Sequence, residues 1–229
     1  MNRIITLGRE FGSGGRELGR RLSEKLGIAY YDQEIITEIA KRTALSVEYI
    51  HRIEDSVPVA SFPIHIGRTF FSMPNPVFQQ SINLFREQHK LISELAEKSD
   101  CLIVGRCADY ILRDSNPFRI FVYADAESKL KRCMDRKPAD ESLTEKEMKK
   151  KIAEIDRGRS QYYGFFSDRK WGARENYDLL INTSGADIKL LAEAAYDYVM
   201  GIWGGEVKLS AALTAAGHLP VNTSKRFIP

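Results

Sequence analysis

The stretch Ile4-Ile5-Thr6-Leu7-Gly8-Arg9-Glu10-Phe11-Gly12-Ser13-Gly14-Gly15-Arg16-Glu17-Leu18-Gly19 decides the fold of this chain. An apolar, β-prone run enters a cluster of glycines and continues into a helical pattern, with Leu18, Leu22 and Leu26 spaced by four. The first backbone N–H groups of a helix have no intrahelical partner, and the helix dipole adds positive potential there. Since glycines also let backbone approach phosphate closely, the stretch predicts a phosphate site. An ordinary strand-to-helix turn would not require four glycines within eight positions.

The glycine cluster departs from the usual phosphate-binding loop, G-x-x-x-x-G-K-[ST], which has a lysine after its last glycine. Here Gly14 is followed by Gly15, Arg16 and Glu17, so the lysine is missing. The guanidinium of Arg16 suits phosphate oxygens, although its reach differs from that of lysine. Glu17 either binds Mg²⁺ or simply occupies the first helical turn, where acidic residues are favoured. The predicted ATP-binding residues are Gly12, Ser13, Gly14, Gly15, Arg16 and Glu17.

Composition restricts the class of protein. The 229 residues are enough for one large α/β domain or a core with a small insert, and the net charge of +3 gives little ground for a nucleic-acid partner. No apolar run approaches the roughly 20 residues of a membrane span, and the first residues do not resemble a signal peptide. Three cysteines and four histidines lack metal-type spacing. We therefore expect a cytoplasmic protein that binds a small molecule, with its oligomeric state open.

Strands alternate with helices along the chain, which predicts a parallel sheet covered by helices on both faces. After the opening run, strands are expected over 28–32, 101–104, 118–124 and 178–183, and amphipathic helices over 33–53, 78–98 and 188–203. Ligands of such folds bind beyond the carboxyl ends of the strands. The glycine cluster, Asp32 and Arg106 all follow predicted strand ends, so we expect them to meet there.

Two segments have no clear periodicity. The stretch 57–77 combines prolines, histidines and phenylalanines and is interpreted as irregular and mobile. The stretch 138–151 is dense in charge, which is typical of a solvated helix face.

Arginines recur where a phosphate-transferring enzyme needs them. Arg106 ends a strand, Arg132 and Arg136 lie one helical turn apart, and Arg157 and Arg159 follow the charged segment. Catalysis of phosphoryl transfer consists mainly of positioning and of neutralising charge on the transferring group. The alternative is that these are surface arginines paired with nearby acids.

Four motifs resemble those of the cytidylate kinase-like family of P-loop proteins: residues 8–15, 31–36, 104–110 and 176–183. The resemblance covers residues 2–200. It implies an α/β fold of the three-layer P-loop NTPase or nucleoside monophosphate kinase type, with a five-stranded parallel sheet and helices on both faces. It also implies one kinase domain over 1–203, with a nucleotide-binding insert at 55–80, a LID at 135–172 and a C-terminal tail at 204–229. ATP and Mg²⁺ would be the cofactors.

The resemblance assigns roles residue by residue. In cytidylate kinases the loop lysine stands where this chain has Gly15. Arg106 matches the arginine that binds the CMP phosphate, and Asp32 matches the acid after the second strand. Asp156 and Arg159 match the last two members of the LID pattern R-x-x-x-D-x-x-R, whereas Ile152 stands in place of the first arginine. The expected substrate-binding residues are Asp32, Arg106, Asp109, Asp156 and Arg159.

Three functions remain open at this point. The first is a kinase of CMP or dCMP, in which Arg16, Arg132, Arg157 and Arg159 act on the transferring group and Glu17 lies near Mg²⁺. The second is a kinase of the same fold for another small acceptor; a hydroxyl acceptor would need a positioned carboxylate such as Asp32. The third is a non-catalytic nucleotide-binding module, for which the missing lysine is the argument.

Overall fold

The computed structural model of the chain describes residues 2–54, 76–138 and 142–204. Its strands form one sheet in the order β2-β3-β1-β4-β5, and all neighbouring pairs are parallel. The strands are β1 (Ile4–Arg9), β2 (Ala29–Tyr31), β3 (Cys101–Val104), β4 (Phe118–Tyr123) and β5 (Leu179–Asn182). The predicted five-stranded parallel sheet is confirmed.

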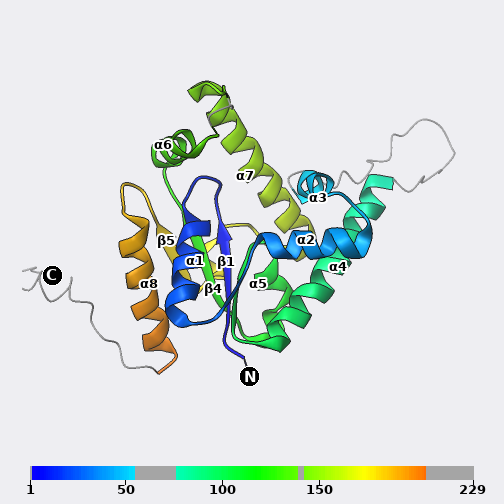
Figure 1. Ribbon diagram of the computed structural model, residues 1–229, viewed down its shortest axis with the longest axis horizontal. Coiled ribbons are helices and arrows are strands. Elements are labelled where there is room, and N and C mark those ends of the chain that lie inside the picture. The colour runs from blue at the N-terminus through cyan, green and yellow to red at the C-terminus, as the bar shows by residue number, and fades with distance from the viewer. Residues whose placement is uncertain (1, 55–75, 139–141, 205–229) are drawn as a thin grey trace, which may run out of the picture.

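Helices cover both faces of the sheet and its carboxyl edge (Figure 1). Helices α1 and α8 lie on one face, α2, α4 and α5 on the other, and α6 and α7 beyond the carboxyl ends of the strands. The helices are α1 (Gly15–Leu26), α2 (Gln33–Thr43), α3 (Val47–Glu54), α4 (Pro76–Lys98), α5 (Ala108–Ile111), α6 (Ala126–Arg136), α7 (Glu145–Ser167) and α8 (Ile188–Ile202).

The sheet separates two hydrophobic cores. Leu18 and Leu22 of α1, two of the residues spaced by four, are fully buried against Ile5 and Leu7 of β1 in one core. The other core joins α2, α4 and α5 to the opposite face of the sheet. Because the central strands β1, β3 and β4 are largely buried on both faces, their apolar runs are nearly continuous rather than alternating.

Helix α7 is longer than the charged segment indicated. It begins at a capping box, in which Thr144 Oγ1 accepts the Glu147 amide and the Glu147 carboxylate accepts the Thr144 amide. Its amino-terminal half carries the expected solvated charges, while Tyr162 and Tyr163 near its other end enter the second core. The segment 57–75 of the predicted irregular stretch and the tail from 205 onward lie outside the described residues.

Candidate active site

The glycine loop between β1 and α1 has the geometry of an anion cradle. Gly12 and Gly14 have φ angles of 76° and 80°, which favour glycine. A Cβ on Gly12 would lie 2.9 Å from the backbone oxygen of Lys129, so that position also lacks space for a side chain. Gly14 is the N-cap of α1 and offers no side-chain hydrogen bond. In the first turn of α1 the Gly15 amide donates to Ser13 Oγ at 3.3 Å, and the N-cap residue leaves the amides after it uncapped, as phosphate binding requires.

Side chains from distant elements hold this loop in place. Ser13 is buried and donates through Oγ to the Glu10 carbonyl at 2.8 Å. Thr183, which follows β5, donates through Oγ1 to the Ser13 carbonyl at 2.6 Å. Arg132 of α6 donates to the Gly12 carbonyl at 3.5 Å and to the Thr183 Oγ1 at 3.2 Å. The loop is thus organised before any ligand arrives.

A cavity of about 360 Å³, here called the loop cavity, opens between the glycine loop, α6 and α7. Its walls include Gly12, Gly14, Gly15, Arg16 and Glu17 of the predicted ATP-binding set, and also Arg132, Arg136 and Lys151. Ser13, the other member of that set, is buried and does not line the cavity. The expectation that Arg132 and Arg136 share a helix face is met, since both line this cavity. Lys151, the neighbour of Ile152 in the altered LID pattern, supplies a cation where the family arginine is absent.

Glu17 lines the loop cavity but its carboxylate is already paired. It accepts hydrogen bonds from Arg21, 3.0 Å away, and from Arg136. Burial alone would raise the pKa of Glu17, but the hydrogen bonds from Arg136 and Arg21 outweigh burial and leave the pKa below its ordinary value. Glu17 is therefore ionised at neutral pH, and a cation would compete with two guanidinium groups for it.

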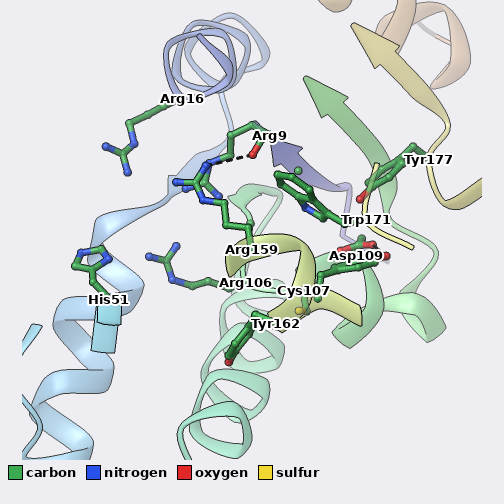
Figure 2. A pocket seen from close by; sticks show the side chains of 13 residues that line it. Arg9, Arg16, His51, Arg106, Cys107, Asp109, Arg159, Tyr162, Trp171 and Tyr177 are labelled. Atoms are coloured by element: carbon green, nitrogen blue, oxygen red, sulfur yellow. Dashed lines mark hydrogen bonds between the residues drawn. The ribbon is translucent and has the colours of Figure 1, made fainter. Parts of the chain in front are cut away.

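A second cavity of about 100 Å³, here called the arginine cavity, lies beside the first and is shown in Figure 2. Its cationic wall consists of Arg9, Arg16, Arg106 and Arg159, which come from β1, α1, the loop after β3, and α7. The remaining wall carries Asp109, His51 and the aromatic residues Tyr162, Tyr163, Trp171 and Tyr177. An anionic head group with an attached ring matches such a lining in charge and in polarity.

Asp32 sits behind the arginines rather than on the cavity surface. It is only 2% exposed, and its carboxylate pairs with Arg16, with Arg9 at 3.5 Å and with Arg106 at 3.7 Å. Three guanidinium groups surround one carboxylate, so the cluster retains positive charge. The predicted meeting of the glycine loop, Asp32 and Arg106 at the strand ends is what the structure contains.

Asp109 lies at the opposite wall of the arginine cavity. Its Oδ2 accepts a 2.7 Å hydrogen bond from the Tyr163 hydroxyl. Burial raises the pKa of Asp109 above its ordinary value, and the hydrogen bond from Tyr163 offsets this only in part. Burial and the charge of Asp109 also raise the pKa of Tyr177. This wall is thus a buried hydrogen-bonding surface on which burial disfavours the charged forms of Asp109 and Tyr177.

The predicted LID residues occupy three different places. Arg159 lines both cavities and donates to the Arg9 carbonyl at 3.3 Å. Asp156 lines neither cavity; it accepts the Phe11 amide at 2.6 Å and the Lys129 ammonium at 2.9 Å. Arg157 is exposed and lines neither cavity. A helix turns 100° per residue, so residues two apart in sequence face nearly opposite directions.

Sequence reasoning did not assign a role to Arg9, Lys129 or Trp171. Arg9 lies inside the stretch that predicted the fold, at the last position of β1, where ligand-facing residues of parallel sheets gather. Its position at the carboxyl end of a strand was the signal from which a role for Arg9 could have been predicted. Lys129 and Trp171 carry no local signal, because their importance depends on contacts with residues far away in sequence.

Comparison with known proteins agrees with this geometry. The model of the cytidylate kinase-like family matches residues 4–185, so the chain belongs to that family. A solved structure of an uncharacterized protein from Eubacterium ventriosum ATCC 27560 is 27% identical, with a TM-score of 0.63 over 86% of this chain and 98% of that one. Among curated proteins, none matches the chain.

Solved structures of shikimate kinases share the fold. The enzyme from Acinetobacter baumannii, in complex with shikimate, is 16% identical with a TM-score of 0.51, over 88% of this chain and 94% of that one. The enzyme from Bacteroides thetaiotaomicron is 13% identical with a TM-score of 0.53, over 88% and 98%. The fold is that of P-loop kinases, and with the family it supports a phosphotransferase acting on a nucleotide or another small molecule.

Among the described residues, no helix is both long enough and apolar enough to cross a bilayer.

Proposed function

We propose that this chain is an ATP- and Mg²⁺-dependent kinase that phosphorylates a nucleoside monophosphate, with CMP or dCMP as the acceptor. The observation that carries the proposal is that two cavities meet at shared cations. Arg9, Arg16 and Arg159 line both the loop cavity and the arginine cavity. A phosphoryl group that passes from one cavity to the other must cross these guanidinium groups, which is where its charge needs stabilisation.

The loop cavity is the proposed ATP site. The first turn of α1, which its N-cap residue leaves uncapped, and the glycines of the loop would hold the β-phosphate, with Arg132 at its side. Mg²⁺ typically takes one or two carboxylates and completes its shell with phosphate oxygens and water. The described residues contain no group of three or more His, Cys, Asp or Glu that could hold a metal ion. In this proposal, Mg²⁺ is held chiefly by the ATP phosphates, with Glu17, which lines the loop cavity, as the candidate carboxylate.

The arginine cavity is the proposed acceptor site. Arg106 would hold the acceptor phosphate, and Arg16 and Arg159 would contact the transferring group. Asp109 and the aromatic wall would receive the nucleoside. Asp156 would fix the glycine loop to α7 through the Phe11 amide. Arg157 lines neither cavity and lies on the opposite side of α7 from Arg159, so only a rotation of α7 about its axis would bring it to the site.

A phosphate acceptor is favoured over a hydroxyl acceptor by the state of Asp32. A hydroxyl group would need a carboxylate within hydrogen-bond reach of its proton. Asp32 is nearly fully buried behind three arginines and is not part of the cavity wall. A monophosphate oxygen is already anionic and needs no such base.

The test is ADP release from ATP and Mg²⁺ with CMP, dCMP, UMP, AMP, GMP or no acceptor. Stimulation by CMP or dCMP well above the other acceptors is expected. If a different nucleotide stimulated ADP release most, the protein would be a nucleoside monophosphate kinase with a different base specificity. ATP binding without stimulation by any of the five would contradict the proposed function and favour another acceptor or a regulatory module.

Arg106→Ala tests the acceptor site. Removing a guanidinium that binds phosphate should raise the acceptor KM about 10-fold to 100-fold, because charge-assisted hydrogen bonds contribute about 1.5–3 kcal/mol each. The ATP KM should stay within about twofold. Arg20→Ala is the matched control, since Arg20 is an exposed arginine of α1 that pairs with Glu24. Equal KM values for Arg106→Ala and the control would contradict the assignment.

A further inference from the structure

Gly15, the glycine that stands in place of the P-loop lysine, is in contact with the side chain of Arg9. A Cβ on Gly15 would lie 2.6 Å from Cβ of Arg9 and 3.2 Å from Cγ. Cβ atoms do not approach so closely, and the root of the Arg9 side chain cannot swing away as a flexible tip could. A side chain at position 15 is therefore incompatible with the side chain at position 9. The two positions share one space, and this chain fills it from β1 instead of from α1.

The guanidinium of Arg9 reaches from that space to the boundary of the two cavities. Arg9 lines both cavities, and Figure 2 shows its side chain beside those of Arg16 and Arg159. The guanidinium passes directly over Gly105, where a Cβ would meet its Nη1. Gly105 thus leaves the room that the long side chain needs. Gly15 and Gly105 therefore leave space on both sides of the Arg9 side chain.

The negative charge near Arg9 does not balance the positive charge of the arginines around it. Asp32 is its anionic partner at 3.5 Å, yet the same carboxylate also pairs with Arg16 and Arg106. Burial and, second to it, the positive charge of Arg159 lower the pKa of Arg9 to about 9. The guanidinium is still protonated at neutral pH. A phosphate at the boundary would relieve the repulsion among these arginines.

We propose that Arg9 supplies, from the end of β1, the positive charge that a lysine at position 15 supplies in the usual P-loop. The inference rests on the proposed function: Arg9 would contact the phosphate chain of ATP at the transferring group. Arg16, by contrast, is half-exposed and directs its guanidinium to Asp32. The missing lysine is then a relocated charge and not a lost one.

An exchange of the two side chains tests this. Arg9→Met keeps the stem and removes the charge, and it should lower phosphoryl transfer about 100-fold or more, the usual effect of losing such a group. The double variant Arg9→Gly with Gly15→Lys restores the first glycine and the lysine of the usual loop, keeps Arg16 where that loop has Ser or Thr, and removes the Cβ contact. It should recover at least about tenfold over Arg9→Gly with Gly15→Met, its neutral control. The contact of a new Cβ with Val122, at 3.1 Å, is the same in both.

The same variants separate this inference from the proposed function. If wild type transfers phosphate and the lysine variant is no more active than the methionine control, the inference is wrong and the function stands. If wild type transfers none, calorimetry with ATP and Mg²⁺ still decides: Arg9→Met should weaken ATP binding about tenfold or more while leaving adenosine binding unchanged. Unchanged ATP affinity would overturn the inference. Should Arg9→Met not fold, the lysine and methionine double variants decide by the same two readouts.

Discussion

At the scale of single residues, the surroundings of two aspartates shift their pKa values in opposite directions. Asp178, in the loop before β5, faces Arg119, which donates to it at 2.7 Å and 3.0 Å. Asp109 instead faces the Tyr163 hydroxyl in a buried wall. Burial acts on both carboxylates and would raise the pKa of each. The hydrogen bonds from Arg119 reverse the direction for Asp178 and lower its pKa, whereas the pKa of Asp109 stays raised.

These directions predict a pH-dependent effect of Asp109→Asn. A folded-state pKa above the unfolded value contributes stability that is complete below the unfolded pKa and is lost as pH rises through the folded pKa. Asparagine still accepts the Tyr163 hydrogen bond but carries no charge to bury. The Tm of Asp109→Asn minus that of wild type should therefore be more positive at pH 7.5 than at pH 4. Each kcal/mol of difference in the free energy of unfolding corresponds to roughly 2–4 °C in Tm. Differential scanning calorimetry at the two pH values measures this.

Asp178→Asn is the control of opposite sign. The lowered pKa of Asp178 contributes stability above the unfolded pKa, near 3.8, that is lost as pH falls through the folded pKa. Its Tm should fall below wild type at pH 7.5 and approach it at acid pH. If the Tm difference from wild type changed with pH in the same direction for both variants, the opposite pKa shifts of Asp109 and Asp178 would be contradicted.

At the scale of elements, one lysine connects the glycine loop to the two helices above it. Lys129 of α6 donates to Glu10 at 3.1 Å and to Asp156 of α7 at 2.9 Å. Asp156 in turn accepts the Phe11 amide. The loop after β1, helix α6 and the middle of α7 are thus tied at a point where all three side chains are largely buried. The phosphate loop and the LID-like segment therefore cannot move independently without breaking this contact.

Lys129→Met should destabilise the protein. It leaves the carboxylates of Glu10 and Asp156 near each other without their shared cation, at a cost of about 1–3 kcal/mol in the free energy of unfolding. Urea denaturation measures the loss. Lys150→Met is the control, because Lys150 is exposed and reaches Glu154 only at 3.7 Å; its effect should stay below about 0.5 kcal/mol. Similar losses for the two lysines would show that the buried network adds little.

At the scale of the whole molecule, the parallel sheet brings segments far apart in sequence to one edge. The glycine loop, the loops after β2 and β3, and α7 all meet beyond the carboxyl ends of the strands (Figure 1). Each face of the sheet has its own core, so the strands and the flanking helices form a rigid base. The site lies at the end of this base, where loops can carry charge without disturbing either core.

A ligand that binds at this edge should stabilise the whole fold. ATP with Mg²⁺ at about 100 times its Kd adds about 2.7 kcal/mol to the free energy of unfolding, which corresponds to a rise in Tm of roughly 5–10 °C. Adenosine at the same concentration should raise the Tm far less, because it lacks the phosphates that the loop binds. A thermal scan of the unmodified chain measures both. Equal shifts for ATP and adenosine would contradict the phosphate cradle.

Much of the fold was predictable because its signals are local. The spacing of Leu18 and Leu22 marks the buried face of α1, and the glycines after β1 mark the turn that leads into it. Arg106 and Asp32 could be placed at the carboxyl edge of the sheet because they follow strands. The extent of α7 was not predicted, since its charged first half and its buried Tyr162 and Tyr163 have no common period.

The order of strands and glycines along the chain by itself determined the parallel sheet and the glycine turn at its carboxyl edge, because each follows from backbone geometry over a few neighbouring residues. Only the tertiary structure decided how the charges pair. Phe11 and Asp156 meet across 145 positions of sequence, and the Arg9 side chain fills the space that Gly15 leaves open. Such contacts depend on where whole elements pack and on the direction in which side chains leave them. No local pattern contains that information.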